Sequence, residues 1–295
     1  MSTLKQWMIT ATFLCLTACS GTADVSPTPT PVPVTPTSSA PTATSLPVAL
    51  TVNNESITLD EFNAEIGRYK ASQNALGNQI NDQQIAQQVS DEFVAQLLLA
   101  QAAQQAGFTL DEAALQTRID TLAAKLGGAD KLSAWQQAHG YSDESFRVAL
   151  KREAESAWMR DQIIAGVPGT AEQVHIRQIL LYNQANAQKY WDRLQAGAEF
   201  DTIAAQVDPI THGDIGWIPR GYLSEQAVED AAFALEPNQY SAVIEDKVGF
   251  HILELIERQA DRPLSPDQML TLQNRALSEW IANRRQQSSV VLGLK

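Results

Sequence analysis

The sequence has few cysteines and few positive charges, and each shortage excludes a class of protein. The two cysteines, Cys15 and Cys19, both lie within the first twenty residues, so we expect no structural disulfide in the rest of the chain. Stability must then come from packed hydrophobic cores. The formal net charge of −13 argues against nucleic acid as a partner, because a nucleic-acid binder needs a basic patch.

The sequence also lacks the signatures of metal, nucleotide and hydrolase chemistry. Its four histidines, at positions 139, 175, 212 and 251, do not have the spacing of metal ligands. A glycine-rich phosphate loop and a G-x-S-x-G elbow are both missing from the sequence. We therefore expect neither a metal nor a cofactor.

The hydrophobic run at the N-terminus is too short to span a bilayer as a mature helix. One lysine precedes an apolar run from Trp7 to Leu16, as in a signal peptide. The run ends in LTAC at Cys19, which resembles the lipobox of bacterial lipoproteins. It predicts a signal peptide over residues 1–18 and lipid on Cys19, which would anchor an extracytoplasmic protein to the cell membrane. The alternative is an ordinary secretory signal that is cleaved nearby.

A tether follows. Residues 19–47 consist mostly of Thr, Pro, Ser, Ala and Val and hold seven of the thirteen prolines. Such a composition cannot form a core and favours extended, polyproline-like segments. We interpret it as a stalk that holds the folded part away from a membrane, with a proline-rich ligand for a partner domain as the alternative.

The segment 48–168 is predicted to be a helical domain. It opens with a hairpin that turns at Asn53-Asn54, and Thr58 or Asp60 then caps the first helix. Apolar residues at three- and four-residue spacings predict further helices over 82–106, 111–126, 129–138 and 142–164. Their apolar faces need one another, so we expect Trp135, Phe146 and Trp158 to lie in the core.

After the Gly166-Val167-Pro168-Gly169 cluster the pattern changes to a small α+β domain. VHIRQILL is a β-rich run, residues 184–196 and 200–207 are predicted helices, and GFHILELIE is a returning strand. Residues 267–286 form a last amphipathic helix, and SSVVLGL is a candidate strand.

The run from Val174 to Arg258 resembles the parvulin type (PpiC-like) of peptidyl-prolyl isomerase. Five pieces occur in order: QILL, RLQAGAEFDTIAAQ, GDIGWIPRG, AAFAL and VGFHIL. The flanking helices are similar in organisation to those of the SurA and PrsA foldases, in which an N-terminal helical domain and a C-terminal helix embrace a parvulin domain.

The resemblance implies an α+β fold with a SurA-like helical domain and a small parvulin domain, whose antiparallel sheet is surrounded by helices. It divides the chain into five parts: a signal peptide (1–18), a tether (19–47), the helical domain (48–168), the isomerase domain (170–262) and a C-terminal helix that packs back on the helical domain (263–295).

The resemblance also implies an apolar pocket for the substrate proline. Ile215 and Leu223 match pocket residues, and Val228 (or Ala227) stands where the family has an aromatic residue. Phe233 matches the phenylalanine that lines the floor. We interpret the glycines, Asp214 and Trp217 around Ile215 as a structural turn.

The polar residues of the family are partly replaced. His251 matches one of two paired histidines, Gln178 stands in place of the other, and Asp246 stands where a serine or threonine is frequent. Asp208 matches the cysteine or aspartate beside the amide. His251 is either a network residue or a core histidine, and Asp208 is either catalytic or a turn aspartate.

The resemblance implies an extracytoplasmic, membrane-anchored isomerase that helps secreted proteins fold, with unfolded or proline-containing polypeptides as clients. The alternatives are a catalytically inert chaperone that binds unfolded clients and a lipoprotein that scaffolds an envelope complex.

Overall fold

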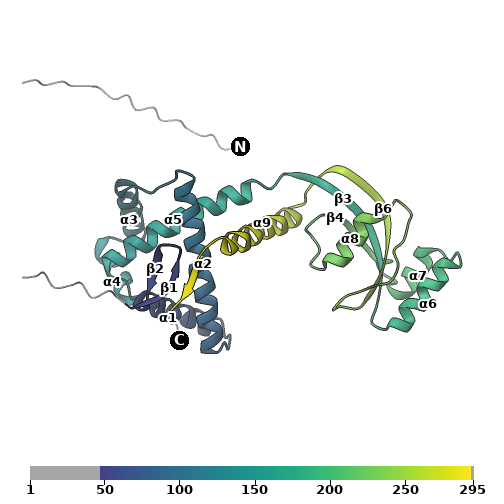
Figure 1. Ribbon diagram of the computed structural model, residues 1–295, viewed down its shortest axis with the longest axis horizontal. Helices are drawn as coiled ribbons and strands as arrows, with labels where there is room; N and C mark the ends of the chain where they lie inside the picture. Colours follow the sequence, from purple (N-terminus) through teal and green to yellow (C-terminus); the bar gives the residue numbers. More distant parts are fainter. Residues whose placement is uncertain (1–46, 294–295) are drawn as a thin grey trace, which may run out of the picture. The chain divides into compact units, whose positions relative to one another are not determined.

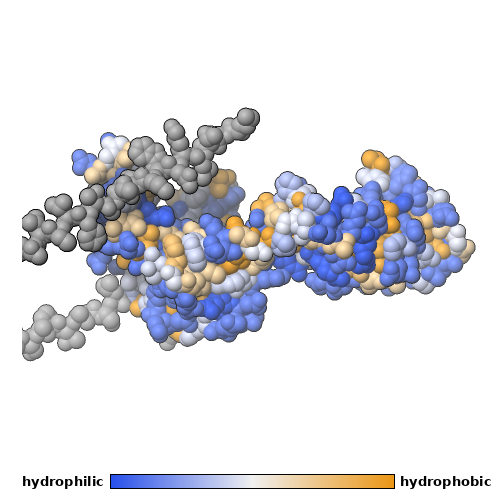
Figure 2. All heavy atoms as spheres, turned by 90° about the horizontal axis from the view of Figure 1, so that it is seen from above, coloured by the Kyte–Doolittle hydropathy of each residue, from blue (hydrophilic) through white to orange (hydrophobic). Residues whose placement is uncertain are grey.

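The computed structural model describes residues 47–293 (Figure 1). The predicted signal peptide, Cys19 and all but the last residue of the tether lie outside the described residues. None of the helices between residues 47 and 293 is both long enough and apolar enough to cross a membrane. On the face seen in Figure 2 the surface is mostly hydrophilic, with hydrophobic residues in separate patches.

The chain opens with the predicted hairpin. Strands β1 (Val48–Val52) and β2 (Glu55–Thr58) pair antiparallel, and Asn53 takes the positive φ of 55° that a tight turn requires. The C-terminal strand β7 (Val290–Leu292) pairs with β1 on its other side. The sequence predicted all three strands, but not that the two ends of the described chain share one sheet.

Five helices follow the hairpin, and most begin at a side-chain cap. Thr58, Asn81, Asp111 and Ser142 each accept a hydrogen bond from a backbone N–H of the first helical turn. Thr58, rather than Asp60, is thus the cap of the first helix. The helices are α1 (Leu59–Ala75), α2 (Asp82–Gln105), α3 (Glu112–Leu126), α4 (Ala129–Ala138) and α5 (Asp143–Ala165).

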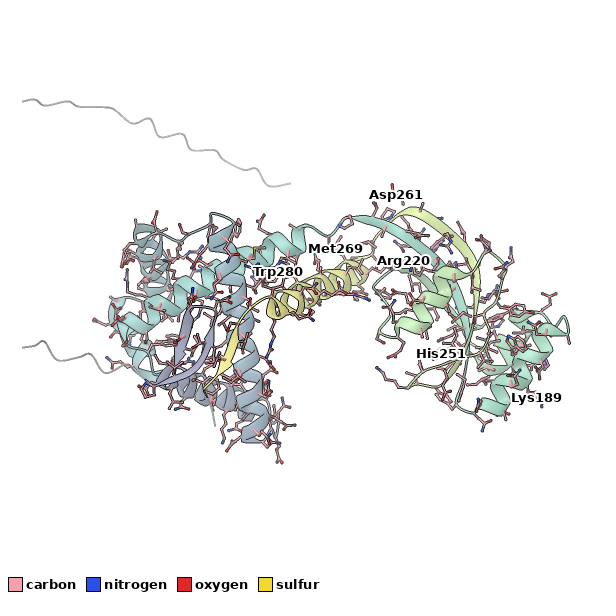
Figure 3. All side chains as sticks on the ribbon, in the orientation of Figure 1. Lys189, Arg220, His251, Asp261, Met269 and Trp280 are labelled. Atoms are coloured by element: carbon pink, nitrogen blue, oxygen red, sulfur yellow. The ribbon has the colours of Figure 1, made fainter. Side chains whose placement is uncertain are left out.

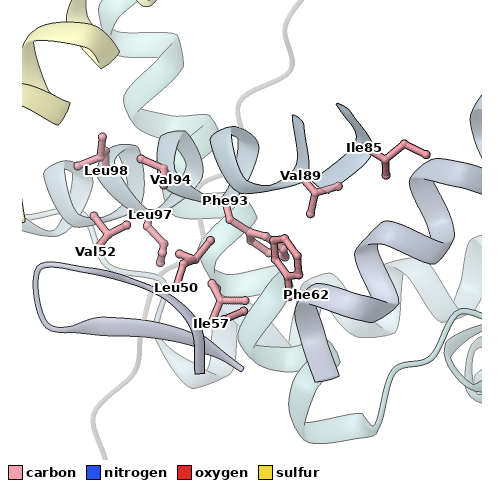
Figure 4. Packing of buried hydrophobic residues seen from close by; sticks show 11 residues of the cluster. Leu50, Val52, Ile57, Phe62, Ile85, Val89, Phe93, Val94, Leu97 and Leu98 are labelled. Carbon is pink, nitrogen blue, oxygen red and sulfur yellow. The ribbon is translucent and has the colours of Figure 1, made fainter. Parts of the chain in front are cut away.

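The main core of this domain lies between the hairpin and helices α1 and α2. Figure 4 shows Leu50 and Ile57 of the hairpin facing Phe62 of α1 and Phe93 of α2. Trp280 and Val290, from the C-terminal part of the chain, pack against the same cluster. Residues more than 200 positions apart therefore complete one core.

The prediction that Trp135 is a core residue is wrong. Its side chain is 38% exposed, because α4 is short and presents one face to Phe146 and Tyr141 while the other stays open. The ring stacks on His139 with centroids 4.1 Å apart. Phe146 is buried as predicted, and Trp158 is half-buried.

The second domain is built on a four-stranded antiparallel sheet in the order β4-β3-β6-β5. Helix α8 packs on one face of this sheet, and α6 and α7 contribute to the cluster on the other. These clusters and the sheet confirm the α+β fold class. The elements are β3 (Thr170–Leu181), α6 (Gln184–Gln195), α7 (Phe200–Val207), β4 (Asp214–Pro219), α8 (Gln226–Ala234), β5 (Ile244–Glu245) and β6 (Phe250–Pro263).

Helix α9 (Pro266–Gln286) contacts both domains. Near its N-terminal end, Gln268 is buried and donates its side-chain amide to the carbonyl of Trp217 at 2.7 Å. Farther along, Trp280 contributes to the first core. Figure 3 labels Met269 and Trp280 on this helix. The contact with the second domain was not predicted from the sequence.

We expect Leu97→Ala to lower the free energy of unfolding by about 2–5 kcal/mol, the usual cost of emptying a buried leucine site. Leu97 is fully buried in the first core, whereas Leu76 is 70% exposed. Leu76→Ala is therefore the matched control, and its urea denaturation midpoint should stay at the wild-type value. Equal midpoints for the two variants would contradict the packing described here.

Candidate active site

The candidate residues lie on one face of the four-stranded sheet. Leu180 of β3 pairs with His251 of β6, and Gln178 pairs with Leu253. Because successive side chains of a strand point to opposite faces, Gln178 and His251 share the face of Leu253, which belongs to the apolar cluster under α8. Figure 3 shows His251 within this domain.

His175 belongs to the opposite face, because it lies three residues before Gln178 on the same strand. Its Nε2 lies 2.8 Å from Oδ1 of Asp214, and its ring stacks on Trp217 with centroids 5.3 Å apart. Burial raises the pKa of Asp214, but the contact with His175 and the N–H of Gly216 outweigh burial and hold the pKa below its ordinary value. His175 therefore takes no part in the cluster around His251.

The turn that enters β4 depends on a very close backbone approach. The N–H of Gln178 donates to the carbonyl of Gly213 at 2.8 Å. Gly213 has φ of 72°, and a Cβ atom there would lie 2.0 Å from the carbonyl oxygen of Gln178. Asp214 then accepts from the N–H of Gly216 at 2.8 Å. Only glycine fits at position 213. The close contact therefore fixes the backbone position from which Ile215 follows.

The four predicted pocket residues meet in one cluster. Val228 and Phe233 of α8 are buried, while Ile215 and Leu223 are half-buried and pack against them. Ala227 is exposed, so Val228 is the residue that faces the cluster. Ile215 and Leu223 can contact a ligand, and the other two lie beneath them.

A buried glutamate, which the sequence did not single out, holds the loop that carries Leu223. Glu229 is 2% exposed and accepts from the N–H of Gly221 at 2.8 Å and from that of Leu223 at 3.2 Å. Arg220 in the same loop lies over the ring of Phe233, 4.1 Å from its centroid. These contacts preorganise the position of Leu223.

His251 is the centre of a buried polar cluster. Its Nδ1 lies 3.1 Å from Oε1 of Gln178, and its Nε2 lies 2.9 Å from Oδ2 of Asp246. The side chains of His251 and Asp246 are only 8% and 5% exposed. The structure therefore brings together the retained histidine and the two residues that replace its usual partners.

Asp246 is held by the turn between β5 and β6. Its Oδ1 accepts from the N–H groups of Val248 at 2.7 Å and Gly249 at 2.9 Å. Burial raises the pKa of Asp246, but these bonds and the contact with His251 outweigh burial and hold the pKa below its ordinary value.

Asp208 ends helix α7, and its carboxylate is engaged in a turn. It accepts from the hydroxyl of Thr211, and from the N–H groups of Thr211 at 3.2 Å and Ile210 at 3.1 Å. The hydroxyl and the backbone donors lower the pKa of Asp208. Asp208 also lines a pocket of about 260 Å³ together with Gln178 and Gly213. The hydrogen bonds of Asp208 described here run to Thr211 and Ile210 and not to His251.

The arrangement suits a reaction that needs no covalent step. Ile215 and Leu223 offer apolar contact to a ring, and Gln178 and His251 provide hydrogen-bonding groups on the same sheet face. Within residues 47–293 no group of three or more histidine, cysteine or carboxylate side chains could hold a metal ion.

We expect Gly213→Ala to destabilise the second domain more than Gly216→Ala. Both glycines have positive φ, which costs an alanine about 1–2 kcal/mol. The Cβ atom at position 213 would also clash with the carbonyl of Gln178, whereas at 216 it meets open space. Urea denaturation measures the difference, and the amide NMR shift of Gln178 should move only in Gly213→Ala. Equal destabilisation would contradict the close approach.

Two family models match the chain. The first, described as a SurA-like N-terminal domain, matches residues 34–147. The second, described as a PPIC-type PPIASE domain, matches residues 181–257 and thus includes Leu223, Val228, His251 and the GDIGW turn.

Curated relatives and solved structures carry related names. The chaperone SurA of Alcanivorax borkumensis is 23% identical over 252 residues, which cover 72% of this chain and 57% of that protein. The foldase protein PrsA of Clostridium kluyveri is 21% identical, over 72% of this chain and 75% of the relative. The crystal structure of PrsA from Bacillus cereus is 20% identical, with a TM-score of 0.43, over 78% of this chain and 82% of that one.

This chain thus spans less than two thirds of the length of the SurA chaperone that it matches. The two domain matches lie in the same order as the helical domain and the four-stranded domain of the fold. The chain combines a SurA-like N-terminal domain with a PpiC-type rotamase domain.

Proposed function

We propose that this protein is an extracytoplasmic peptidyl-prolyl cis-trans isomerase, anchored to the cell membrane through lipid on Cys19, which assists the folding of secreted proteins. The observation that carries the proposal is the placement of Ile215 and Leu223 on the same sheet face as the Gln178–His251 pair. This placement occurs within a domain that matches the PPIC-type model.

The reaction itself sets modest demands. An X–Pro bond isomerises over a barrier of about 18–20 kcal/mol, because rotation breaks the amide resonance. A catalyst can lower this barrier by holding the proline ring in an apolar site and stabilising the twisted amide. No bond to the protein forms, so no nucleophile or cofactor is required.

Each residue has a role in this proposal. Ile215 and Leu223 contact the proline ring, while Val228 and Phe233 support them from below. Gln178 and His251 form the polar side of the site. Asp208 borders the pocket that Gln178 also lines, where it would face the chain that carries the proline.

The other parts of the chain would serve the clients. We propose that residues 170–262 form the isomerase unit and that residues 48–168, with the helix in 263–295, bind unfolded or proline-containing polypeptides. Contacts of Trp280 with the first core support the assignment of the C-terminal segment to that client-binding unit.

One observation favours the alternative of an inert, client-binding chaperone. Both ring nitrogens of His251 face groups of the protein itself, Gln178 on one side and Asp246 on the other. The Nε2 atom makes no hydrogen bond, but it is buried, so little of the ring is open to a substrate. The two functions are separated by a single kinetic measurement.

We expect the full chain to accelerate exchange between cis and trans forms of short X–Pro peptides, measured by NMR exchange spectroscopy. Leu223→Ala should lower the rate roughly tenfold, because it removes about 1–2 kcal/mol of apolar contact with the ring. Leu126→Ala changes an exposed leucine of the helical domain and should keep the wild-type rate.

An uncatalysed exchange rate in the wild type, with peptide shifts that still move on titration, would contradict the isomerase proposal. The domain would then be a binding module, and the chaperone alternative would hold.

The anchor is tested independently. Wild-type protein produced in bacteria should incorporate labelled fatty acid and sediment with membranes, and Cys19→Ser should do neither. Cys15→Ser is the matched control, because position 15 lies inside the predicted signal peptide and should leave lipidation intact. Membrane sedimentation of Cys19→Ser, or an unlabelled wild type, would contradict lipid anchoring.

A further inference from the structure

The helical domain contains a cavity that the proposed isomerase site does not use. It has a volume of about 280 Å³ and is lined by residues of α1, α2, α4 and α5. Phe93, labelled in Figure 4, belongs both to the first core and to this lining. Trp135, Tyr141 and Phe146 also line the cavity. Trp135 is partly exposed, so the cavity has an aromatic wall that a ligand can reach.

Carboxylates outnumber cations in this cavity. The charged side chains of the lining are the carboxylates Glu61, Glu65, Glu92 and Glu153 and the cations Arg68 and Arg152. Arg68 pairs with Glu65 at 2.5 Å, and Arg152 pairs with Glu61. Within the described part of the chain, both cations of the lining are thus taken up, and Glu92 and Glu153 are left without one.

The two remaining carboxylates form the outer part of the cavity. Glu92 and Glu153 are exposed, whereas Phe93 and Arg152 are buried. Partial burial raises the pKa of Glu92, and the negative charges of neighbouring glutamates, Glu153 among them, raise it further. A cation between Glu92 and Glu153 would relieve this repulsion. An apolar side chain would instead cover both carboxylates without compensating their lost hydration.

The chain itself shows how this cavity holds a guanidinium group. The central carbon of the Arg68 guanidinium lies 4.3 Å from the ring centroid of Tyr141, and that of Arg152 lies 5.5 Å from the centroid of Phe93. Each of these two cations also pairs with a carboxylate. Trp135 and the two outer carboxylates offer the same combination of ring and acid, and tryptophan is the aromatic residue that attracts cations best.

A second cavity favours a polypeptide over a free cation as the ligand. It has a volume of about 490 Å³ and shares Glu61, Arg68 and Tyr141 with the first cavity. It adds two carboxylates, Asp60 and Glu144, and no further cation. A chain whose side chain enters the first cavity can therefore continue along the second, where the surface is again acidic.

We propose that the first cavity binds an arginine side chain of an unfolded client, with its guanidinium against Trp135 and its charge held by Glu92 and Glu153. Arginine fits better than lysine, because a planar guanidinium stacks on an aromatic ring and can reach two carboxylates at once. The inference rests on the proposed function, in which the helical domain binds clients, and it adds that basic segments are preferred.

The experiment titrates the full chain with a short, proline-free peptide that carries arginine among glycine, serine and asparagine. The comparison is the same peptide with citrulline, a neutral side chain of the same shape, in place of arginine. The signal is the indole N–H of Trp135 in the NMR spectrum, which is assigned by its loss in Trp135→Phe. The arginine peptide should shift this signal and bind roughly tenfold more tightly than the citrulline peptide.

Variants test the two outer carboxylates. Glu92→Gln combined with Glu153→Gln should weaken binding of the arginine peptide roughly tenfold, to the level of the citrulline peptide. Asp130→Asn combined with Asp161→Asn is the charge-matched control, because both are exposed carboxylates of the same domain and neither lines the cavity. The control should keep the wild-type affinity.

Equal affinities for the arginine and citrulline peptides would overturn the inference. If the Trp135 signal moved with both peptides, the client-binding role of the helical domain would stand without a preference for basic residues. Equal weakening in the two double variants would also overturn it, because only the overall charge of the protein would then attract the peptide. A wild type that binds neither peptide would refute both the inference and the client-binding role.

The isomerase proposal is tested separately from this inference. The peptides contain no proline, so a wild type that fails to catalyse X–Pro exchange can still bind the arginine peptide at Trp135. The backbone amide spectrum shows whether each variant folds. The comparison of the two peptides uses the wild type, so it decides the question even if a variant does not fold.

Discussion

The long antiparallel pairing of β3 with β6 is the constraint on which the second domain depends. Its register runs from Thr170 opposite Pro263 to Leu181 opposite Phe250. Pairing fixes the faces of both strands, so it places Gln178 and His251 on one side and the core residues Ile179 and Ile252 on the other. A slip of one residue in either strand would send its side chains to the wrong face. The polar cluster is thus as strongly specified as the hydrophobic core.

Two buried carboxylates then hold loops to this frame. Glu229 binds the backbone of the loop that carries Leu223, and Asp246 binds the backbone of the turn beside His251. In each case the carboxylate is on a neighbouring element or turn, and its acceptor oxygens satisfy backbone N–H groups that would otherwise be unpaired. The loops of the site are therefore held by hydrogen bonds as well as by hydrophobic packing.

The sequence predicted the parts of the structure that depend on local rules. Hairpin, helix caps and the close-approach glycine all follow from backbone preferences, and the order of the motifs placed Ile215, Leu223 and His251 in one domain. The sequence could not show the roles of Glu229, Asp246 or Gln268, because a charged or amide side chain on a helix or turn is usually exposed to solvent. Only the packing of elements that are distant in the sequence shows that these three side chains are buried. Trp135 is the opposite case, since a tryptophan at a core-like spacing remained partly exposed on a short helix.

The pairing of β7 with β1 determines the order in which the two domains can be completed during synthesis. The core of the first domain includes Trp280 and Val290, which are synthesised after the whole of the second domain. The second domain, by contrast, is formed by one continuous segment whose strands all lie between Thr170 and Pro263. Its sheet can close while the first domain still lacks a strand and part of its core. The domain that begins first in the chain is therefore the last to be completed, and its apolar hairpin stays open until synthesis reaches the C-terminal strand.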